Sequence, residues 1–175
     1  MNIARTKRKR KSPIERKKQL LQAAKLVLLE EGLTNFTIDQ VAQKADLSKG
    51  SVYVYYRSKD ELLNDLSILA LTKLYEAFQQ EITPDKNSLE LLSTLCWAYY
   101  RFYVHHKSYH ALFQYVEQLS VEVIDDTFVT YSQKIQLLYT DIIRQGQARQ
   151  EIKEDLEAAV VMSIIWAGIL SVIQF

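Results

Sequence analysis

Apolar residues recur at helical spacing along most of the chain, and residues that start or stop helices divide this pattern into segments. Ser12-Pro13-Ile14-Glu15 has the order of a capping box, with proline at the tolerant first helical position. Gly32 favours a left-handed helix end. The pattern therefore predicts a first helix from about Ser12 to Gly32. Its apolar stripe consists of Leu20, Ala23, Ala24, Val27 and Leu28.

Three more helix starts follow within a short stretch of sequence. Thr37 can cap a second, short helix that ends near Ala45, and Ser48 can cap a third that runs to about Tyr55. Ser58 begins a fourth helix. A short helix, a tight turn and another short helix form a helix-turn-helix, whose second helix enters the major groove of DNA.

Beyond Ser58 the pattern predicts five longer helices, at about residues 59–80, 89–107, 109–119, 124–146 and 155–174. Pro84 breaks the first connection, and Gly146 is expected to end the fourth of these helices. We therefore predict an all-α protein. It would consist of a basic disordered arm at 1–12, a helix-turn-helix DNA-binding domain at 13–57, and a helical ligand-binding and dimerisation domain at 58–175.

The charge is distributed unevenly along the chain. The net charge is +1, but residues 1–60 carry fourteen basic and six acidic residues, and the remainder carries eight basic and fifteen acidic ones. A basic front on an acidic body indicates a polyanionic partner for the front alone. Six of the seven residues of Arg5–Lys11 are basic. Such an arm would either lie in the minor groove or along phosphates, or add only nonspecific attraction.

Two lysines stand where helix stability alone favours acidic residues. Lys49 and Lys59 occupy the first turns of the third and fourth predicted helices, where a cation opposes the helix dipole. Either lysine alone would be read as a solvated surface charge. Together with the basic front, the pair favours phosphates bound at helix starts.

The segments FTIDQVA, from Phe36 to Ala42, and LSKGSVYVYYRSKDEL, from Leu47 to Leu62, closely resemble the DNA-binding signature of the TetR/AcrR family. The resemblance covers about residues 13 to 65. It implies a TetR-like fold and a dimeric transcriptional repressor that a small molecule releases from a palindromic operator. The departure is Tyr56, where the family usually has phenylalanine or another apolar residue, and a tyrosine fits there if its hydroxyl reaches the surface.

The resemblance also implies which residues contact double-stranded DNA. Lys49 and Ser51 would reach base edges, Gly50 would let the backbone come close, and Tyr53 would bind a phosphate. Core packing is the competing interpretation for each tyrosine of the recognition helix. The full predicted set is Thr37, Ser48, Lys49, Gly50, Ser51, Tyr53, Val54, Tyr55 and Lys59.

The 89–107 helix is apolar on most sides, which is typical of a helix enclosed by others. TetR-like proteins place such a helix beside their ligand cavity. Trp97, Tyr99, Tyr103 and Phe113 are therefore candidate wall residues for a flat apolar ligand, with plain core packing as the alternative. Nothing in the sequence identifies the ligand.

No enzyme chemistry, cofactor or metal is predicted. There is no nucleophile–base pair and no glycine-rich phosphate loop, and His105, His106 and His110 lack the partners of a metal motif. The single cysteine, Cys96, is expected to be a small buried residue and suits a reducing cytoplasm.

The uncharged stretch Ala158–Phe175 is predicted to form a dimer surface rather than a membrane span. TetR-family dimers generally use their final two helices, whereas only one such helix is present here, so the chain is either a short member or continues natively. The alternative function is a helical partner-binding or membrane-associated protein that uses the basic arm and this apolar helix.

Overall fold

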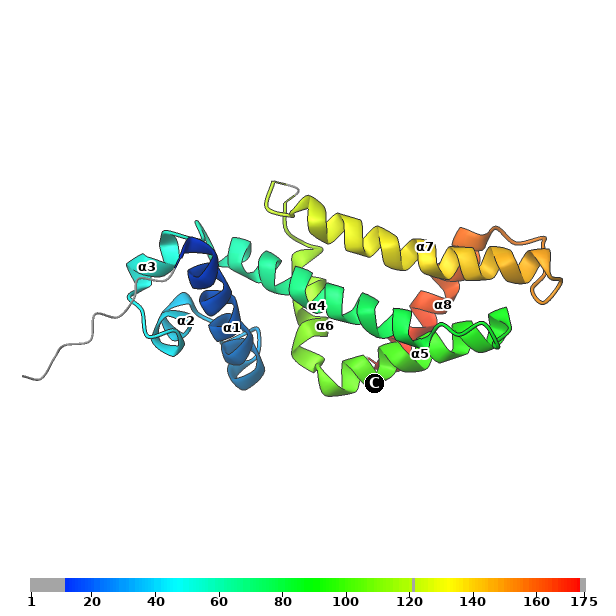
Figure 1. Cartoon of the computed structure of the whole chain (residues 1–175), viewed down its shortest axis with the longest axis horizontal. Coiled ribbons are helices and arrows are strands. Elements are labelled where there is room, and N and C mark those ends of the chain that lie inside the picture. The colour runs from blue at the N-terminus through cyan, green and yellow to red at the C-terminus, as the bar shows by residue number, and fades with distance from the viewer. Residues whose placement is uncertain (1–11, 121, 174–175) are drawn as a thin grey trace, which may run out of the picture. The chain divides into compact units, whose positions relative to one another are not determined.

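The structure, a computed structural model, describes residues 12–120 and 122–173, and every regular element within these ranges is an α-helix (Figure 1). The prediction of an all-α fold is confirmed. The predicted basic arm lies outside the described residues, apart from its last position. The chain divides into two compact units, Met1–Leu62 (unit 1) and Leu63–Phe175 (unit 2).

Unit 1 contains α1 (Pro13–Glu31), α2 (Ile38–Lys44), α3 (Lys49–Tyr53) and the start of α4 (Lys59–Glu81). The helix starts lie where the capping residues predict them. Ser12 and Thr37 each form a complete capping box, with Glu15 and Gln40 respectively. Local side-chain hydrogen bonds therefore fix where α1 and α2 begin.

The core of unit 1 is formed by the predicted stripe of α1 and the apolar residues of α2 and α3, including Leu20, Leu28, Val41 and Val52. Tyr56 also belongs to this core and is 0% exposed, so the expectation that its hydroxyl reaches the surface is wrong. The Lys17 ammonium group lies 5.0 Å from the centre of its ring. The site tolerates a tyrosine inside the small core.

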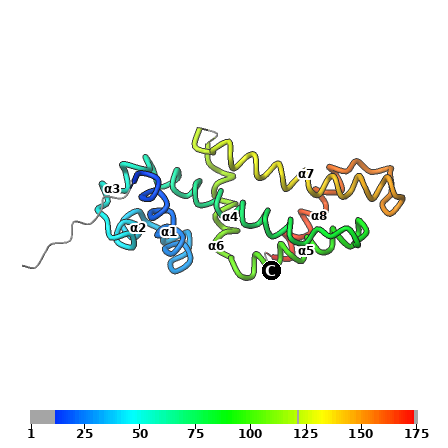
Figure 2. The backbone as a smooth tube through the Cα atoms, viewed as in Figure 1, coloured from blue at the N-terminus to red at the C-terminus, as the bar shows by residue number. Residues whose placement is uncertain are grey.

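Unit 2 contains the rest of α4 together with α5 (Ser88–His105), α6 (Lys107–Val116), α7 (Asp126–Ala148) and α8 (Ala158–Ile173). Helix α5 packs against α6, α7 and α8, and α7 packs against α8, as the tube in Figure 2 shows. The core includes Phe78, Leu95, Leu112, Val116 and Ile143. Helix α5 thus has neighbours along its buried face, but Leu89, Trp97 and Val104 are exposed, so the expectation that it is enclosed on most sides is wrong.

Gly146 does not end its helix, contrary to the prediction. It is buried inside α7, which continues to Ala148. A Cβ atom at this position would lie 2.8 Å from the Ser88 Cβ and 2.8 Å from the Ile152 Cδ1. The glycine is therefore required by close packing rather than by a turn. The residue with a left-handed backbone after this helix is Gln150, with φ of 61°.

The helices in the described ranges include none that is long and apolar enough to cross a membrane.

Candidate nucleic-acid interface and ligand cavity

Helix α3 begins with a pair of serines whose side chains bind each other. The Ser48 Oγ accepts a hydrogen bond from the Ser51 backbone N–H at 3.2 Å and lies 2.8 Å from the Ser51 Oγ. Gly50 is exposed, and the nearest atom to a Cβ built on it is 4.0 Å away. Internal packing therefore does not require a glycine here. The bare backbone leaves room for close approach by an external partner.

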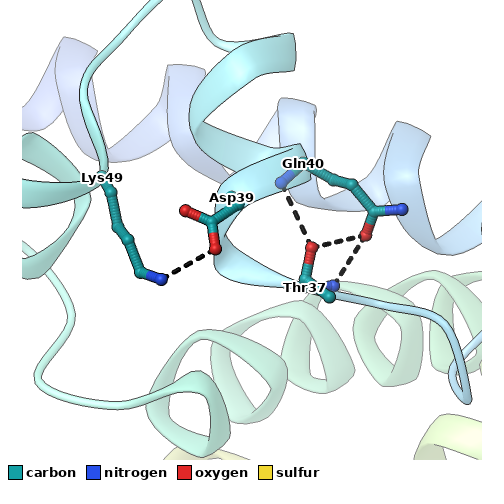
Figure 3. A network of polar contacts seen from close by, with 4 residues as sticks. All are labelled: Thr37, Asp39, Gln40 and Lys49. Atoms are coloured by element: carbon teal, nitrogen blue, oxygen red, sulfur yellow. Dashed lines mark hydrogen bonds and ion pairs between the residues drawn. The ribbon is translucent and has the colours of Figure 1, made fainter.

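Lys49 is engaged in an ion pair. Its Nζ lies 2.7 Å from the Oδ2 of Asp39, in the first turn of α2, and both side chains are more than half exposed (Figure 3). The hydrogen bond from Lys49 to Asp39 and the carboxylate charge raise the pKa of the lysine above its ordinary value. Sequence reasoning missed Asp39, because a side chain ten residues away reaches Lys49 only through the turn between α2 and α3.

The Thr37 hydroxyl is fully occupied within the capping box. It donates to the Gln40 Oε1 at 2.7 Å and accepts from the Gln40 backbone N–H at 3.3 Å. The Thr37 backbone N–H also donates to this Oε1, at 2.9 Å. These bonds fix the orientation of the Gln40 amide, and its NH₂ group points away from Thr37 (Figure 3). Sequence reasoning used Gln40 only as a helix cap.

The three tyrosines of this region have different surroundings. Tyr53 is 46% exposed and Tyr55 is half-buried, whereas Tyr56 is enclosed in the core. Val54 is 77% exposed. Tyr53 and Val54 therefore lie on the solvent-exposed side of α3 and of the turn that follows it.

Lys59 is tied to the loop before α2. Its Nζ donates to the Phe36 backbone carbonyl at 2.8 Å and lies 5.6 Å from the centre of the Phe36 ring. The side chain is half-buried, so this lysine also stabilises the packing of unit 1. All nine predicted DNA-contact positions lie in unit 1, and none of the nine is buried.

Unit 2 encloses a cavity of about 420 Å³ whose wall is built from α4, α5, α6, α7 and α8. Of the four predicted wall residues, Tyr99 and Phe113 line it. Trp97 does not and is 60% exposed, because it stands two positions from Tyr99 on α5 and so points away. Tyr103 lies outside the lining, with its ring edge-on to His110 at 5.4 Å between centres.

Polar groups meet at one part of this wall. The Tyr99 hydroxyl lies 3.1 Å from the His110 Nδ1. Burial raises the pKa of Tyr99 and lowers the pKa of His110. Tyr139, 1% exposed, also lines the cavity, and its pKa is likewise raised by burial. All three side chains are therefore neutral near pH 7.

Unit 1 has two short capped helices joined by a tight turn, and the first turn of the second helix is exposed. This arrangement defines a helix-turn-helix transcriptional regulator that binds DNA. Residues 20–66 match the family model described as bacterial regulatory proteins, tetR family. Unit 1 therefore carries a DNA-binding domain similar to that of the TetR family, as the resemblance in its sequence implied.

Relatives of this family cover most of the chain. It is 25% identical over 154 residues to the HTH-type transcriptional repressor KstR2 of Mycolicibacterium smegmatis, an alignment that spans 87% of this chain and 75% of that protein. The fold is similar to that of FadR from Bacillus subtilis in complex with stearoyl-CoA, with a TM-score of 0.73 and 18% identity over 89% of this chain and 84% of that one. It is also similar to the ketosteroid regulator KstR2 of Mycobacterium tuberculosis, with a TM-score of 0.69 and 23% identity over 91% and 82%.

Proposed function

We propose that the protein is a dimeric cytoplasmic repressor that leaves a palindromic operator when a small apolar molecule enters the cavity of unit 2. The observation that carries this proposal is the presence, in one chain, of a helix-turn-helix and a separate cavity in a largely apolar core. DNA binding is assigned to residues 13–57, and ligand binding and dimerisation to residues 58–175. Helix α4 belongs to both units, because it begins at Lys59 and continues to Leu71 and Leu74 of the cavity wall.

The ligand is proposed to have a large apolar part. The cavity volume lies within the range of about 300–1,000 Å³ that is usual for small-molecule sites. The similar FadR structure holds stearoyl-CoA, and the similar KstR2 is described as a ketosteroid regulator. Both names denote molecules with an extended apolar portion, which fits a wall dominated by aliphatic and aromatic side chains. Occupation of the cavity would lower operator affinity by favouring a conformation that binds DNA less well.

Dimerisation is proposed to use α8. Val160, Ile164 and Val172 on this helix are 46%, 62% and 65% exposed, and Ala167 and Gly168 between them are small and exposed. A second copy of the chain would cover this apolar face. Two recognition helices related by a two-fold axis would then read two halves of a palindrome.

At the DNA, the nine positions predicted from the sequence remain the proposed contacts, with two adjustments. Gln40 is added as a phosphate donor, since its NH₂ group points away from the Thr37 hydroxyl that its Oε1 binds, and the side chain is half-buried. Lys59 is given a second, structural role through its bond to the Phe36 carbonyl.

Selection of binding sites from random duplex DNA by the purified protein tests the regulatory proposal. A dimeric repressor should enrich a palindrome whose half-sites lie about one helical turn apart, or a multiple of it. Enrichment of a single half-site by a protein that sediments as a monomer would contradict the dimer. Failure to enrich any sequence would contradict operator-specific binding.

A further inference from the structure

We propose that the cavity of unit 2 recognises an apolar molecule by a neutral carbonyl oxygen, and that the Tyr99–His110 pair and Tyr139 are the groups that bind this oxygen. The inference rests on the proposed function only in taking this cavity as the ligand site. It adds the chemical class of the ligand and the residues that select it.

The Tyr99–His110 pair has more hydrogens to donate than its mutual bond uses. A neutral imidazole carries one N–H and the tyrosine one O–H, and their mutual bond of 3.1 Å uses one of the two hydrogens. If the tyrosine donates, the His110 Nε2 carries the remaining N–H. If the histidine donates from Nδ1, the tyrosine O–H remains. In both tautomers the pair keeps one donor to offer, so it calls for an acceptor atom.

Two polar atoms at this wall lack a hydrogen-bond partner among the described residues. The His110 Nε2 and the Tyr139 hydroxyl are both buried and have no hydrogen-bond partner among the residues that the structure describes. Both residues line the cavity. A buried polar atom without a partner destabilises the fold, so a ligand atom that supplies the missing hydrogen bond is favoured at this wall. Two donor-bearing side chains at one cavity wall fit a carbonyl oxygen, which has two lone pairs.

The charges at the cavity wall favour a neutral ligand group. Among the described residues, no lysine or arginine lines the cavity, and the one carboxyl group at its wall is that of Glu117, whose pKa desolvation raises. A carboxylate or phosphate enclosed here would lack a counter-charge, which is strongly unfavourable in a low-dielectric site. The enclosed part of the ligand is therefore neutral. The rest of the wall, including Phe128, Met162 and Leu170, suits a hydrocarbon body.

Tryptophan fluorescence gives a direct binding assay that does not depend on DNA. The chain has two tryptophans, and Trp166 lines the cavity 4.9 Å from the Tyr99 ring, between ring centres, whereas Trp97 lies outside the lining. In a Trp97→Phe protein, Trp166 is the single reporter. The probes are methyl nonyl ketone and undecanoate, which have the same number of carbons and differ in the charge of the oxygen-bearing group.

We expect the ketone to change Trp166 fluorescence and to bind about tenfold or more tightly than undecanoate. Tyr99→Phe and Tyr139→Phe should each weaken ketone binding by roughly three- to tenfold, the range for one lost hydrogen bond. Tyr103→Phe is the matched control, since this tyrosine stands on the same helix as Tyr99 but outside the lining, and it should leave ketone affinity unchanged.

Thermal melting separates recognition from a structural role. Tyr139→Phe removes a buried hydroxyl that has no partner among the described residues, so the Tm of the ligand-free protein should stay equal or rise while ketone affinity falls. Equal ketone affinity in all the tyrosine variants, or tighter binding of undecanoate, would overturn this assignment and leave the proposed function intact. If neither probe alters Trp166 fluorescence while the protein still selects a palindrome, the cavity assignment fails and only the DNA-binding role survives.

Discussion

At the scale of single residues, Lys49 in the first turn of α3 is already engaged in an ion pair within the protein. Lys49 must leave Asp39, 2.7 Å away, in order to contact a base or phosphate, and the Asp39 carboxylate itself repels phosphates. An exposed ion pair contributes little to stability. In the proposed interface the pair would instead weaken the attraction to DNA in general, so that only a site offering Lys49 a good acceptor would overcome it.

Asp39→Asn should therefore increase the affinity for every DNA sequence. The ratio of the affinity for the operator to the affinity for a scrambled duplex should fall. We expect about a threefold gain in affinity for scrambled DNA, the scale of one exposed ion pair. Fluorescence anisotropy over a series of salt concentrations measures it. In a Lys49→Met background most of the gain should disappear. Asp46→Asn makes the same charge change in unit 1, and an equal gain from that control would mean that net charge alone is responsible.

Gln40 offers a second test at this scale. In Gln40→Glu an oxygen still accepts from the Thr37 backbone N–H, so α2 should stay capped, but the NH₂ donor is replaced by a negatively charged oxygen. We expect an unchanged Tm and a loss of DNA affinity of about tenfold. Gln43→Glu, on the same helix and exposed, controls for the added charge. Equal losses in both variants would remove Gln40 from the interface.

At the scale of elements, the helix starts could be predicted from sequence because capping is local. Ser12 and Thr37 bind groups three residues away, and such bonds depend on nothing distant. The role of Gly146 could not be predicted from the sequence. A glycine is needed there because Ser88, from another helix, comes close to it. The residues of the cavity wall could be predicted only in part. The aromatic stripe of α5 is visible in the sequence. Which of its faces meets the cavity depends on how the neighbouring helices pack.

The same contrast gives a stability prediction for Gly146. Alanine in a helix interior is ordinarily more stable than glycine by about 0.5–1 kcal/mol. Here the added Cβ would lie 2.8 Å from the Ser88 Cβ, which is too close, and overpacking of this kind destabilises by about 1–3 kcal/mol. Gly146→Ala should thus lower the free energy of unfolding, measured with urea. Gln145→Ala, at an exposed neighbouring position, should change it little, and a Gly146→Ala protein more stable than the parent would contradict the packing argument.

At the scale of the whole molecule, the proposed repressor needs two copies of the chain, because one recognition helix reads only one half-site. The exposed apolar residues of α8 are the surface proposed for this pairing. Ile164 stands near the middle of the helix, is 62% exposed, and is absent from the lining of the 420 Å³ cavity. Dimerisation and ligand binding can therefore be perturbed separately.

Ile164→Lys should convert the dimer to a monomer by placing a charge in the apolar interface, where it would be desolvated without a partner. Affinity for the palindrome should fall by about a hundredfold as the second half-site contact is lost, while ketone binding reported by Trp166 stays within about twofold, since the cavity wall is unchanged. Leu89→Lys is the matched control, because this residue of α5 is 55% exposed and lies outside α8. Sedimentation velocity and anisotropy with the selected operator measure both effects. An Ile164→Lys protein that remains dimeric and binds the operator fully would show that α8 is not the dimer surface, and a Leu89→Lys protein that dissociates would point to α5 instead.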